Sequence, residues 1–129
     1  MKYFLLLLLS ILLVNCKNQK ENLPEKLKLS KVKVTQTVFN FGNIHVGDTV
    51  NYSFIIKNIS ERKFIIDTVG TSCGCTTTQF TRDSVRKNEI AKIDVQYIAD
   101  QSGKISKSIV VSDNSETGFQ TFYLKGKVE

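Results

Sequence analysis

Hydrophobic and polar residues alternate along most of the chain after residue 31. A repeat of two places every second side chain on the same face of an extended strand, so this pattern predicts strands with one buried face. Turn clusters rich in Asn, Asp, Ser and Gly separate the alternating segments at short intervals. No segment beyond the first fifteen residues has a sustained helical period. The seven expected strands lie at residues 32–39, 50–57, 64–71, 76–80, 91–97, 105–111 and 122–128.

Seven short strands at this spacing are typical of a β-sandwich, in which two sheets pack face to face. The alternation also assigns faces within the strands. Tyr52 and Phe54 are expected on the inward face of a central strand. Lys107 interrupts the hydrophobic row of its own strand, and we expect it near an edge of the sandwich.

The first fifteen residues follow a different pattern. Lys2 and the free amino group give a positive start, and the 12 residues from Tyr3 to Val14 are apolar except for Ser10. A membrane-spanning helix needs about 20 residues. A short apolar run behind a positive start is typical of a secretory signal peptide, which we place at residues 1–15. The alternatives are a buried core helix or a short anchor, but the run has no amphipathic period.

The end of this run indicates lipid modification. Leu13-Val14-Asn15-Cys16 resembles the bacterial lipobox, although Asn15 stands where Gly, Ala or Ser is usual. Cleavage would leave Cys16 as the first mature residue, carrying acyl chains such as palmitate on its sulfur and nitrogen. Several chains matter because one alone binds a membrane only marginally. We therefore expect an exported lipoprotein of the cell envelope. By resemblance to lipoprotein sorting, Lys17 after the cysteine favours the outer membrane.

Residues 16–31 are expected to be the lipidated cysteine and a flexible tether, followed by one domain at 32–129. Residues 17–31 hold the only proline, five lysines and two glutamates. From residue 32 onward the chain has 12 Lys and Arg and 10 Asp and Glu, so the domain is nearly balanced in charge. The basic excess beside the membrane suits anionic lipid head groups. No nucleic-acid partner is expected, because the domain itself has little positive charge.

A family resemblance rests on two motifs. Residues 39–49, FNFGNIHVGDT, are similar to the opening of immunoglobulin-like domains related to the PapD and major-sperm-protein folds. Residues 72–76, Ser-Cys-Gly-Cys-Thr, resemble the hallmark of an uncharacterised bacterial group, domain-of-unknown-function family 1573. The likeness covers about residues 36–128. It implies an all-β fold, an immunoglobulin-like seven-stranded sandwich, and an exported lipoprotein setting. It implies no established activity.

Cys73 and Cys75 form the chemically suggestive pair of the domain. Three cysteines would leave an odd thiol in an exported protein, but lipid on Cys16 leaves an even pair. Gly74 relaxes the backbone enough for a small-loop disulfide, which would be labile and redox-active if strained and exposed. Two thiolates could instead hold a soft ion such as Cu(I). A structural zinc site needs four ligands, and this motif gives two. We favour a structural link or simple burial over both active roles.

Other catalytic groups are not apparent in the sequence. His45 is the sole histidine, and nothing places it against either cysteine of the pair, as a catalytic cysteine would need. There is no phosphate-binding glycine loop and no conspicuous pair of carboxylates. We therefore expect no enzyme, no cofactor and no bound metal, and the sequence identifies no small-molecule substrate.

Three Asp-Thr/Ser-Val triplets begin at Asp48, Asp67 and Asp83. They resemble the O-glycosylation acceptor pattern of exported Bacteroidetes proteins, although Asp with Ser or Thr is also ordinary turn chemistry. Ser84 is the best candidate acceptor because it lies in a polar loop.

Two classes of function follow from these features. In the first, the domain is a non-catalytic protein-interaction or structural module that is held at the membrane and binds an envelope protein through a sheet edge or loop end. In the second, Cys73 and Cys75 handle thiol redox chemistry or copper in the envelope. We prefer the first, because the sequence offers no set of catalytic groups.

Overall fold

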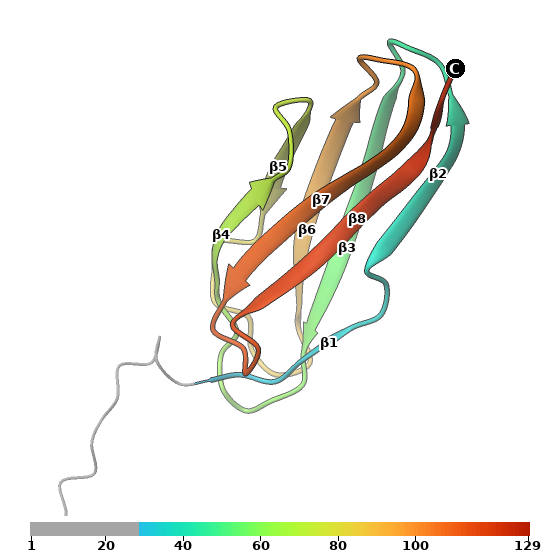
Figure 1. Ribbon diagram of the computed structural model, residues 1–129. Coiled ribbons are helices and arrows are strands. Elements are labelled where there is room, and N and C mark those ends of the chain that lie inside the picture. The colour runs from blue at the N-terminus through green and yellow to red at the C-terminus, as the bar shows by residue number, and fades with distance from the viewer. Residues whose placement is uncertain (1–28) are drawn as a thin grey trace, which may run out of the picture.

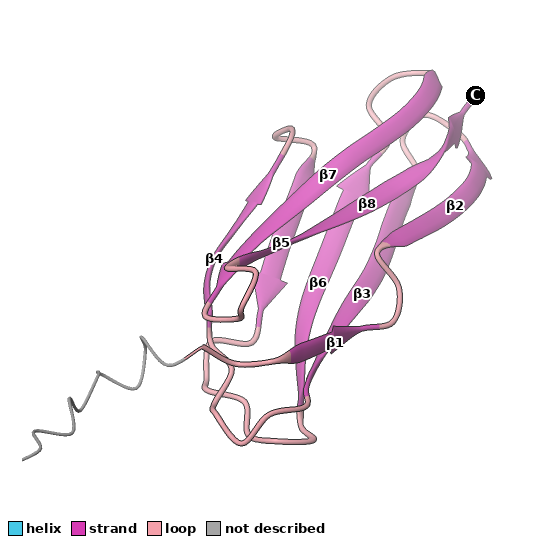
Figure 2. Ribbon diagram, turned by 60° about the horizontal axis from the view of Figure 1, so that its bottom comes forward, coloured by secondary structure: helices cyan, strands magenta, loops and turns pink. Residues whose placement is uncertain are grey.

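The computed structural model describes residues 29–129 of the chain. The expected signal peptide, Cys16 and most of the expected tether lie outside the described residues. Within 29–129 the regular structure consists of strands without a helix, as Figure 2 shows, so this part of the chain offers no helix that could cross a membrane. The strands are β1 (Val32–Val34), β2 (Val38–Ile44), β3 (Thr49–Asn58), β4 (Ile66–Thr71), β5 (Thr76–Phe80), β6 (Ile90–Ile98), β7 (Gly103–Asp113) and β8 (Phe119–Val128).

The strands form two four-stranded sheets that pack face to face (Figure 1). Sheet 1 has the strand order β1-β3-β6-β5, and sheet 2 has the order β2-β8-β7-β4. Neighbouring strands are antiparallel except β2, which runs parallel to β8. The prediction of an all-β sandwich is therefore confirmed.

Eight strands are present where the sequence predicted seven, because the first expected strand divides between the two sheets. β1 pairs with β3 in sheet 1, whereas β2 pairs with β8 in sheet 2. Gln36 lies in the segment that passes from β1 in sheet 1 to β2 in sheet 2, and its side chain fixes this crossing. Its Nε2 donates to the Val38 carbonyl at 2.9 Å, and the Tyr52 hydroxyl donates to its Oε1 at 3.0 Å. Both strands point hydrophobic residues into the same core, so the sequence alternation does not reveal the change of sheet.

A β-bulge at Gly42 keeps β2 in phase with the core. The register of β2 against β8 shifts between Asn40 and Gly42. Gly42 has a φ of 74°, in the left-handed region that glycine adopts without steric cost. Phe41 is the extra residue, and because of it both Phe41 and Ile44 pack against the core. An unbroken alternation would turn one of them outward.

The core between the sheets is built around aromatic residues of β3 and β8. Phe54 is 1% exposed, and its ring centroid lies 4.7 Å from that of Phe122 and 4.8 Å from that of Tyr52. Tyr52 in turn stacks on Phe39 of β2 at 3.8 Å. The prediction that Tyr52 and Phe54 lie on the inward face of a central strand is confirmed.

The described chain enters the sandwich at Ser30, which is fully buried. Ser30 forms a parallel bridge with Ser115 in the β7–β8 loop. Its backbone N–H donates to the Asn114 carbonyl at 2.9 Å, and its hydroxyl donates to Asn114 Oδ1 at 3.2 Å. The Asn114 side chain also donates to the carbonyl of Lys63 at 2.9 Å. Packing therefore begins two residues before the expected domain boundary at residue 32.

The two ends of the sandwich carry different parts of the chain (Figure 1). The entry end holds Ser30 and the β7–β8 loop at residues 114–118. The far end holds the β2–β3 loop at 45–48, the β4–β5 turn at 72–75 and the β6–β7 loop at 99–102. The ten residues of β8 run between the two ends, which at about 3.3 Å per residue lie roughly 30 Å apart.

Candidate functional site

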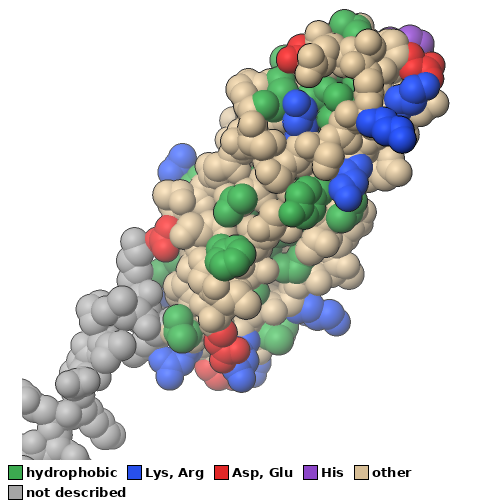
Figure 3. Space-filling view, viewed as in Figure 1, with side chains coloured by type: hydrophobic (Ala, Val, Ile, Leu, Met, Phe, Trp, Pro, Cys, Tyr) green, Lys and Arg blue, Asp and Glu red, His purple; other side chains and the backbone are tan. Residues whose placement is uncertain are grey.

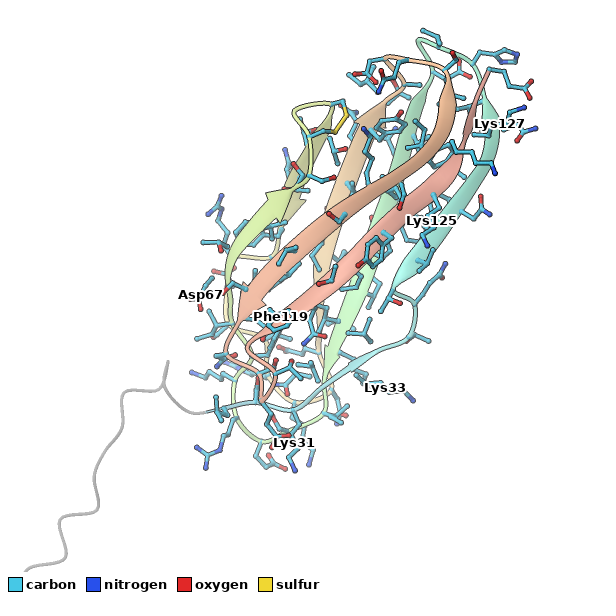
Figure 4. All side chains as sticks on the ribbon, viewed as in Figure 1. Lys31, Lys33, Asp67, Phe119, Lys125 and Lys127 are labelled. Atoms are coloured by element: carbon cyan, nitrogen blue, oxygen red, sulfur yellow. A yellow bond between two sulfur atoms is a disulfide. The ribbon has the colours of Figure 1, made fainter. Side chains whose placement is uncertain are left out.

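Cys73 and Cys75 form a disulfide in the turn that carries the chain from sheet 2 to sheet 1. The two sulfur atoms lie 2.04 Å apart, and the two Cα atoms 5.4 Å apart. Figure 4 shows this bond at the far end of the sandwich, at the tip of the β4–β5 connection. The turn thus places the two candidate cysteines together at an edge of the sandwich.

Hydrogen bonds within the turn fix its shape around the disulfide. The hydroxyl of Thr71 donates to the Cys73 carbonyl at 3.0 Å and reaches the Thr76 carbonyl at 3.3 Å. The Thr76 N–H donates back to the Cys73 carbonyl at 3.4 Å, and its Oγ1 lies 3.5 Å from Cys73 Sγ. A polar side chain on each side of the disulfide therefore holds the tight connection between β4 and β5.

The same turn is tied to both sheets. The Ser72 N–H donates to the Ser108 carbonyl on β7 at 3.0 Å, and the Ser108 N–H donates to Ser72 Oγ at 3.1 Å. On the other side, the Ile98 N–H at the end of β6 donates to the Cys75 carbonyl at 3.1 Å. The turn therefore links sheet 2 to sheet 1 at this edge, and the disulfide lies where the link is made.

Both cysteines are half-buried, and Cys75 packs against the core while Gly74 between them is exposed. One side of the disulfide is thus open to solvent. Sulfur atoms bonded to each other offer no thiolate for a copper ion. Among residues 29–129, no group of three or more His, Cys, Asp and Glu side chains is arranged to hold a metal. The chemistry available to the pair in this state is disulfide exchange or reduction.

His45 lies in the β2–β3 loop, away from the disulfide. Strands β3 and β6 separate that loop from β5, which follows the cysteine turn. The His45 side chain is 82% exposed, and its Nδ1 lies 3.8 Å from Asp48 Oδ2. The same carboxylate oxygen accepts the His45 backbone N–H at 2.8 Å. His45 is therefore a loop residue that does not contact either cysteine of the pair.

Tyr97 is a buried polar residue that the sequence did not single out. Its side chain is fully buried, and its hydroxyl has no hydrogen-bond partner among the residues described. Burial, and to a smaller extent the Asp100 carboxylate, raise the pKa of Tyr97 above its usual value.

Lys107 extends its ammonium to 5.9 Å from the centre of the Tyr97 ring. The pairing of β4 with β7 ends at Ile109, so Lys107 lies on a stretch of β7 that is paired with β8 alone, which agrees with the expected position near an edge, and its side chain covers a core ring.

The candidate glycosylation triplets occupy three different settings. Ser84 is exposed in the loop between β5 and β6, while the next residue, Val85, is buried and bridges to Phe64. Thr49 at the start of β3 and Thr68 in β4 are also exposed. Ser84 thus has the accessible loop position that a modified residue requires.

The outward face of sheet 2 is a second candidate site, and the sequence alone did not indicate it. Lys104 on β7 lies directly opposite Lys127 on β8 in the strand register. Further along the same face Val110 and Phe119 are 46% and 58% exposed. The outward phase of these residues can be read from the alternation. These residues lie together only because β7, β8 and β2 pair with one another, and that pairing cannot be read from the sequence.

These features define the class of the protein as an immunoglobulin-like β-sandwich of the PapD-like type. The ASH/PapD-like domain 7 of human CEP192 is similar, with a TM-score of 0.59 and 12% sequence identity over 90% of this chain and 95% of that chain. The chain itself belongs to the family described as a protein of unknown function (DUF1573), whose model matches residues 32–128. The family proposed from the sequence is confirmed, and the solved structure supports the expected immunoglobulin-like fold.

Two further structures share the fold. A protein of unknown function from Porphyromonas gingivalis W83 has a TM-score of 0.67 and 13% identity over 84% of this chain. The secreted serine protease VesC from Vibrio cholerae has a TM-score of 0.59 and 9% identity over 81% of this chain. The matched parts make up 51% and 24% of those chains, so the domain corresponds to a portion of each. No curated protein gives a significant match.

Proposed function

We propose that this protein is a lipid-anchored component of the bacterial cell envelope whose sandwich domain binds another protein and catalyses no reaction. The observation that carries the proposal is the outward face of sheet 2, where Val110 and Phe119 are 46% and 58% exposed. Apolar side chains gathered on one face of a sheet are typical of a protein-binding surface. The PapD-like neighbour and the family of unknown function are compatible with a binding domain.

The anchor in this proposal is Cys16, and the membrane is the outer membrane. The described chain enters the domain at Ser30, at the entry end. A tether from Cys16 would therefore hold the entry end toward the membrane and leave the far end free to meet a partner. The disulfide turn and the other far-end loops would then lie on the side away from the anchor. The envelope partner is a protein, since the nearly balanced charge of the domain does not favour nucleic acid.

The test is capture of the lipidated full chain with its partner from cross-linked envelopes. Val110→Ser with Phe119→Ser removes the apolar surface of sheet 2. A matched control is Ile90→Ser with Ile98→Ser, because these residues are 44% and 49% exposed on the outward face of sheet 1. We expect wild type and the control to capture the same protein, and the sheet 2 variant to lose it. Equal capture by all three proteins, or capture by none, would contradict the proposal.

A second candidate function uses the disulfide, and its open position at the far end favours this candidate. An envelope dithiol would transfer two electrons and two protons to the Cys73–Cys75 bond, giving two thiols here and a disulfide in the donor. The reduced pair would offer two thiolates, which suit a soft ion such as Cu(I). Alkylation with mass spectrometry, and elemental analysis of protein purified without chelators, test this candidate. Repeated reduction and reoxidation of the Cys73–Cys75 pair, or copper bound to the purified protein, would support this candidate over the protein-binding function.

A further inference from the structure

Three lysines project from the outward face of sheet 2 toward the far end. Lys104 on β7 lies directly opposite Lys127 on β8, and Lys125 is the next outward residue along β8. Figure 4 labels Lys125 and Lys127 on this face, and Figure 3 shows the basic side chains gathered near the end where the C-terminus lies. With Asn40 and Asn43 of β2, the three lysines line a shallow hollow of about 380 Å³.

Acidic side chains do little to balance this lysine cluster. Lys127 pairs with Glu129 at 2.8 Å. Among residues 29–129, no carboxylate lies within ion-pair distance of Lys104 or Lys125. Like charges directly opposite each other on neighbouring strands destabilise a sheet. The hollow therefore carries an unbalanced positive charge that an anionic ligand would stabilise.

An apolar row continues from the lysine cluster along the same face. Val38 on β2 lies beside Tyr123 on β8, and Tyr123 also lies under the ammonium of Lys125, 5.5 Å from its ring centre. Val110 on β7 lies opposite Thr121, which places it diagonally between Tyr123 and Phe119. Val38, Val110 and Phe119 are 38%, 46% and 58% exposed. Figure 3 shows hydrophobic side chains on this face below the basic group.

We infer that this face binds a segment of the partner protein that is acidic at one end and apolar at the other. The inference deepens the proposed function and rests on it. A phosphate or a sugar polymer would suit the lysines but would leave Val38, Val110 and Phe119 uncovered. In the proposed arrangement the anchor holds the entry end at the membrane, so the lysines at the far end would face away from the lipid head groups. A polypeptide supplies both carboxylates and apolar side chains in one ligand.

The spacing along β8 sets the length of the bound segment. Phe119 and Lys127 stand eight residues apart, which at about 3.3 Å per residue is roughly 26 Å. The acidic end of the segment lies over the lysine cluster, toward the far end. Its apolar end lies over Val110 and Phe119, toward the entry end. This polarity fixes the direction in which the partner approaches the domain.

The test uses the full lipidated chain in neutral detergent micelles and two synthetic peptides that share the same apolar half. One peptide carries four glutamates in its other half, and the second carries four lysines there. The charge-reversed protein is Lys104→Glu with Lys125→Glu and Lys127→Glu. A matched control reverses three exposed lysines on the outward face of sheet 1: Lys33→Glu, Lys57→Glu and Lys92→Glu. Fluorescence anisotropy measures binding at low and high salt.

We expect the wild type and the sheet 1 control to bind the glutamate peptide with affinities within about twofold of each other. The charge-reversed sheet 2 protein should bind it about tenfold or more weakly and should bind the lysine peptide instead. High salt should weaken the wild-type complex, because the exposed charges are then screened. Val110→Ser with Phe119→Ser should weaken the binding of the glutamate peptide when it is added to the wild type. The same pair of changes should weaken the binding of the lysine peptide when it is added to the charge-reversed protein.

Two outcomes would overturn the inference. One is equal binding of the glutamate peptide to the wild type and the charge-reversed protein. The other is binding to phosphatidylglycerol vesicles or inorganic phosphate, lost on charge reversal, without binding to the peptide. The proposed function has its own test in envelope capture. A partner captured equally by wild type and by Lys104→Glu with Lys125→Glu and Lys127→Glu would leave the proposed function standing while this inference fails.

Discussion

The ring of Phe41 lies over Gly126, so closely that a Cβ at residue 126 would come within 2.2 Å of Phe41 Cε2. Phe41 is the extra residue in the bulge of β2, and Gly126 lies on β8, to which β2 runs parallel. The missing side chain at 126 therefore lets the edge strand place an aromatic ring in the core. The centre of the Phe41 ring also lies 5.7 Å from the centre of the Tyr97 ring.

Gly126→Ala should destabilise the domain by about 1–3 kcal/mol, because the ring of Phe41 would have to move. Urea unfolding followed by circular dichroism measures the change. Phe41→Leu with Gly126→Ala should cost less than the sum of the two single changes, because the smaller side chain relieves the clash. Additive costs would show that the methyl group at 126 and the Phe41 ring do not collide.

Phe54→Ala should lower the free energy of unfolding by about 3–5 kcal/mol, since it leaves a cavity among Tyr52 and Phe122. Lys57→Ala, on the outward face of the same strand, is the control and should change stability by less than about 0.5 kcal/mol. A loss below about 1 kcal/mol for Phe54→Ala would mean that the core tolerates the cavity and that this ring is not central to it.

Cys16→Ala should release the protein from the membrane fraction, because the acyl chains have no other attachment site in the lipobox. Fractionation and incorporation of labelled fatty acid measure the effect. Wild-type protein gives the reference for both measurements. A Cys16→Ala protein that still partitions into detergent and still incorporates lipid would refute the lipobox assignment.

Cys73→Ser with Cys75→Ser should lower stability only modestly. A loop this short removes little entropy from the unfolded chain, well below the roughly 3 kcal/mol of a fifteen-residue loop. The hydrogen bonds of Thr71 and Ser72 would still hold the turn to the two sheets. Alkylation with mass spectrometry should find the wild-type pair oxidised to each other. Free, metal-free and unreactive thiols would contradict both the disulfide and a redox role.

The sequence predicted the parts of the fold that depend on local pattern. The alternation around Tyr52 and Phe54 predicted an inward face, because each strand presents its own hydrophobic row to the core. The motif at 72–76 suggested the family, and the match over residues 32–128 confirms that family. The inward face of Tyr52 and Phe54 is confirmed as well.

The features that the sequence did not predict depend on residues far apart in the chain. The crossing held by Gln36 leaves the alternation intact, so one expected strand became β1 and β2. The contact of Phe41 with Gly126 joins residues more than eighty positions apart. The opposition of Lys104 and Lys127 arises from the β7–β8 register. Such pairings follow from the assembled sheets, and a single sequence carries no local signal for them.

The central claim is that the domain acts by binding a protein and needs no chemistry at the disulfide. The most direct measurement is the dissociation constant of the captured partner for the purified full chain, with and without Cys73→Ser and Cys75→Ser. We predict that the two constants agree within about twofold, because the binding face of sheet 2 lies outside the turn. A loss of about tenfold or more, with the variant still folded, would contradict the claim and favour the disulfide as the working part of the domain.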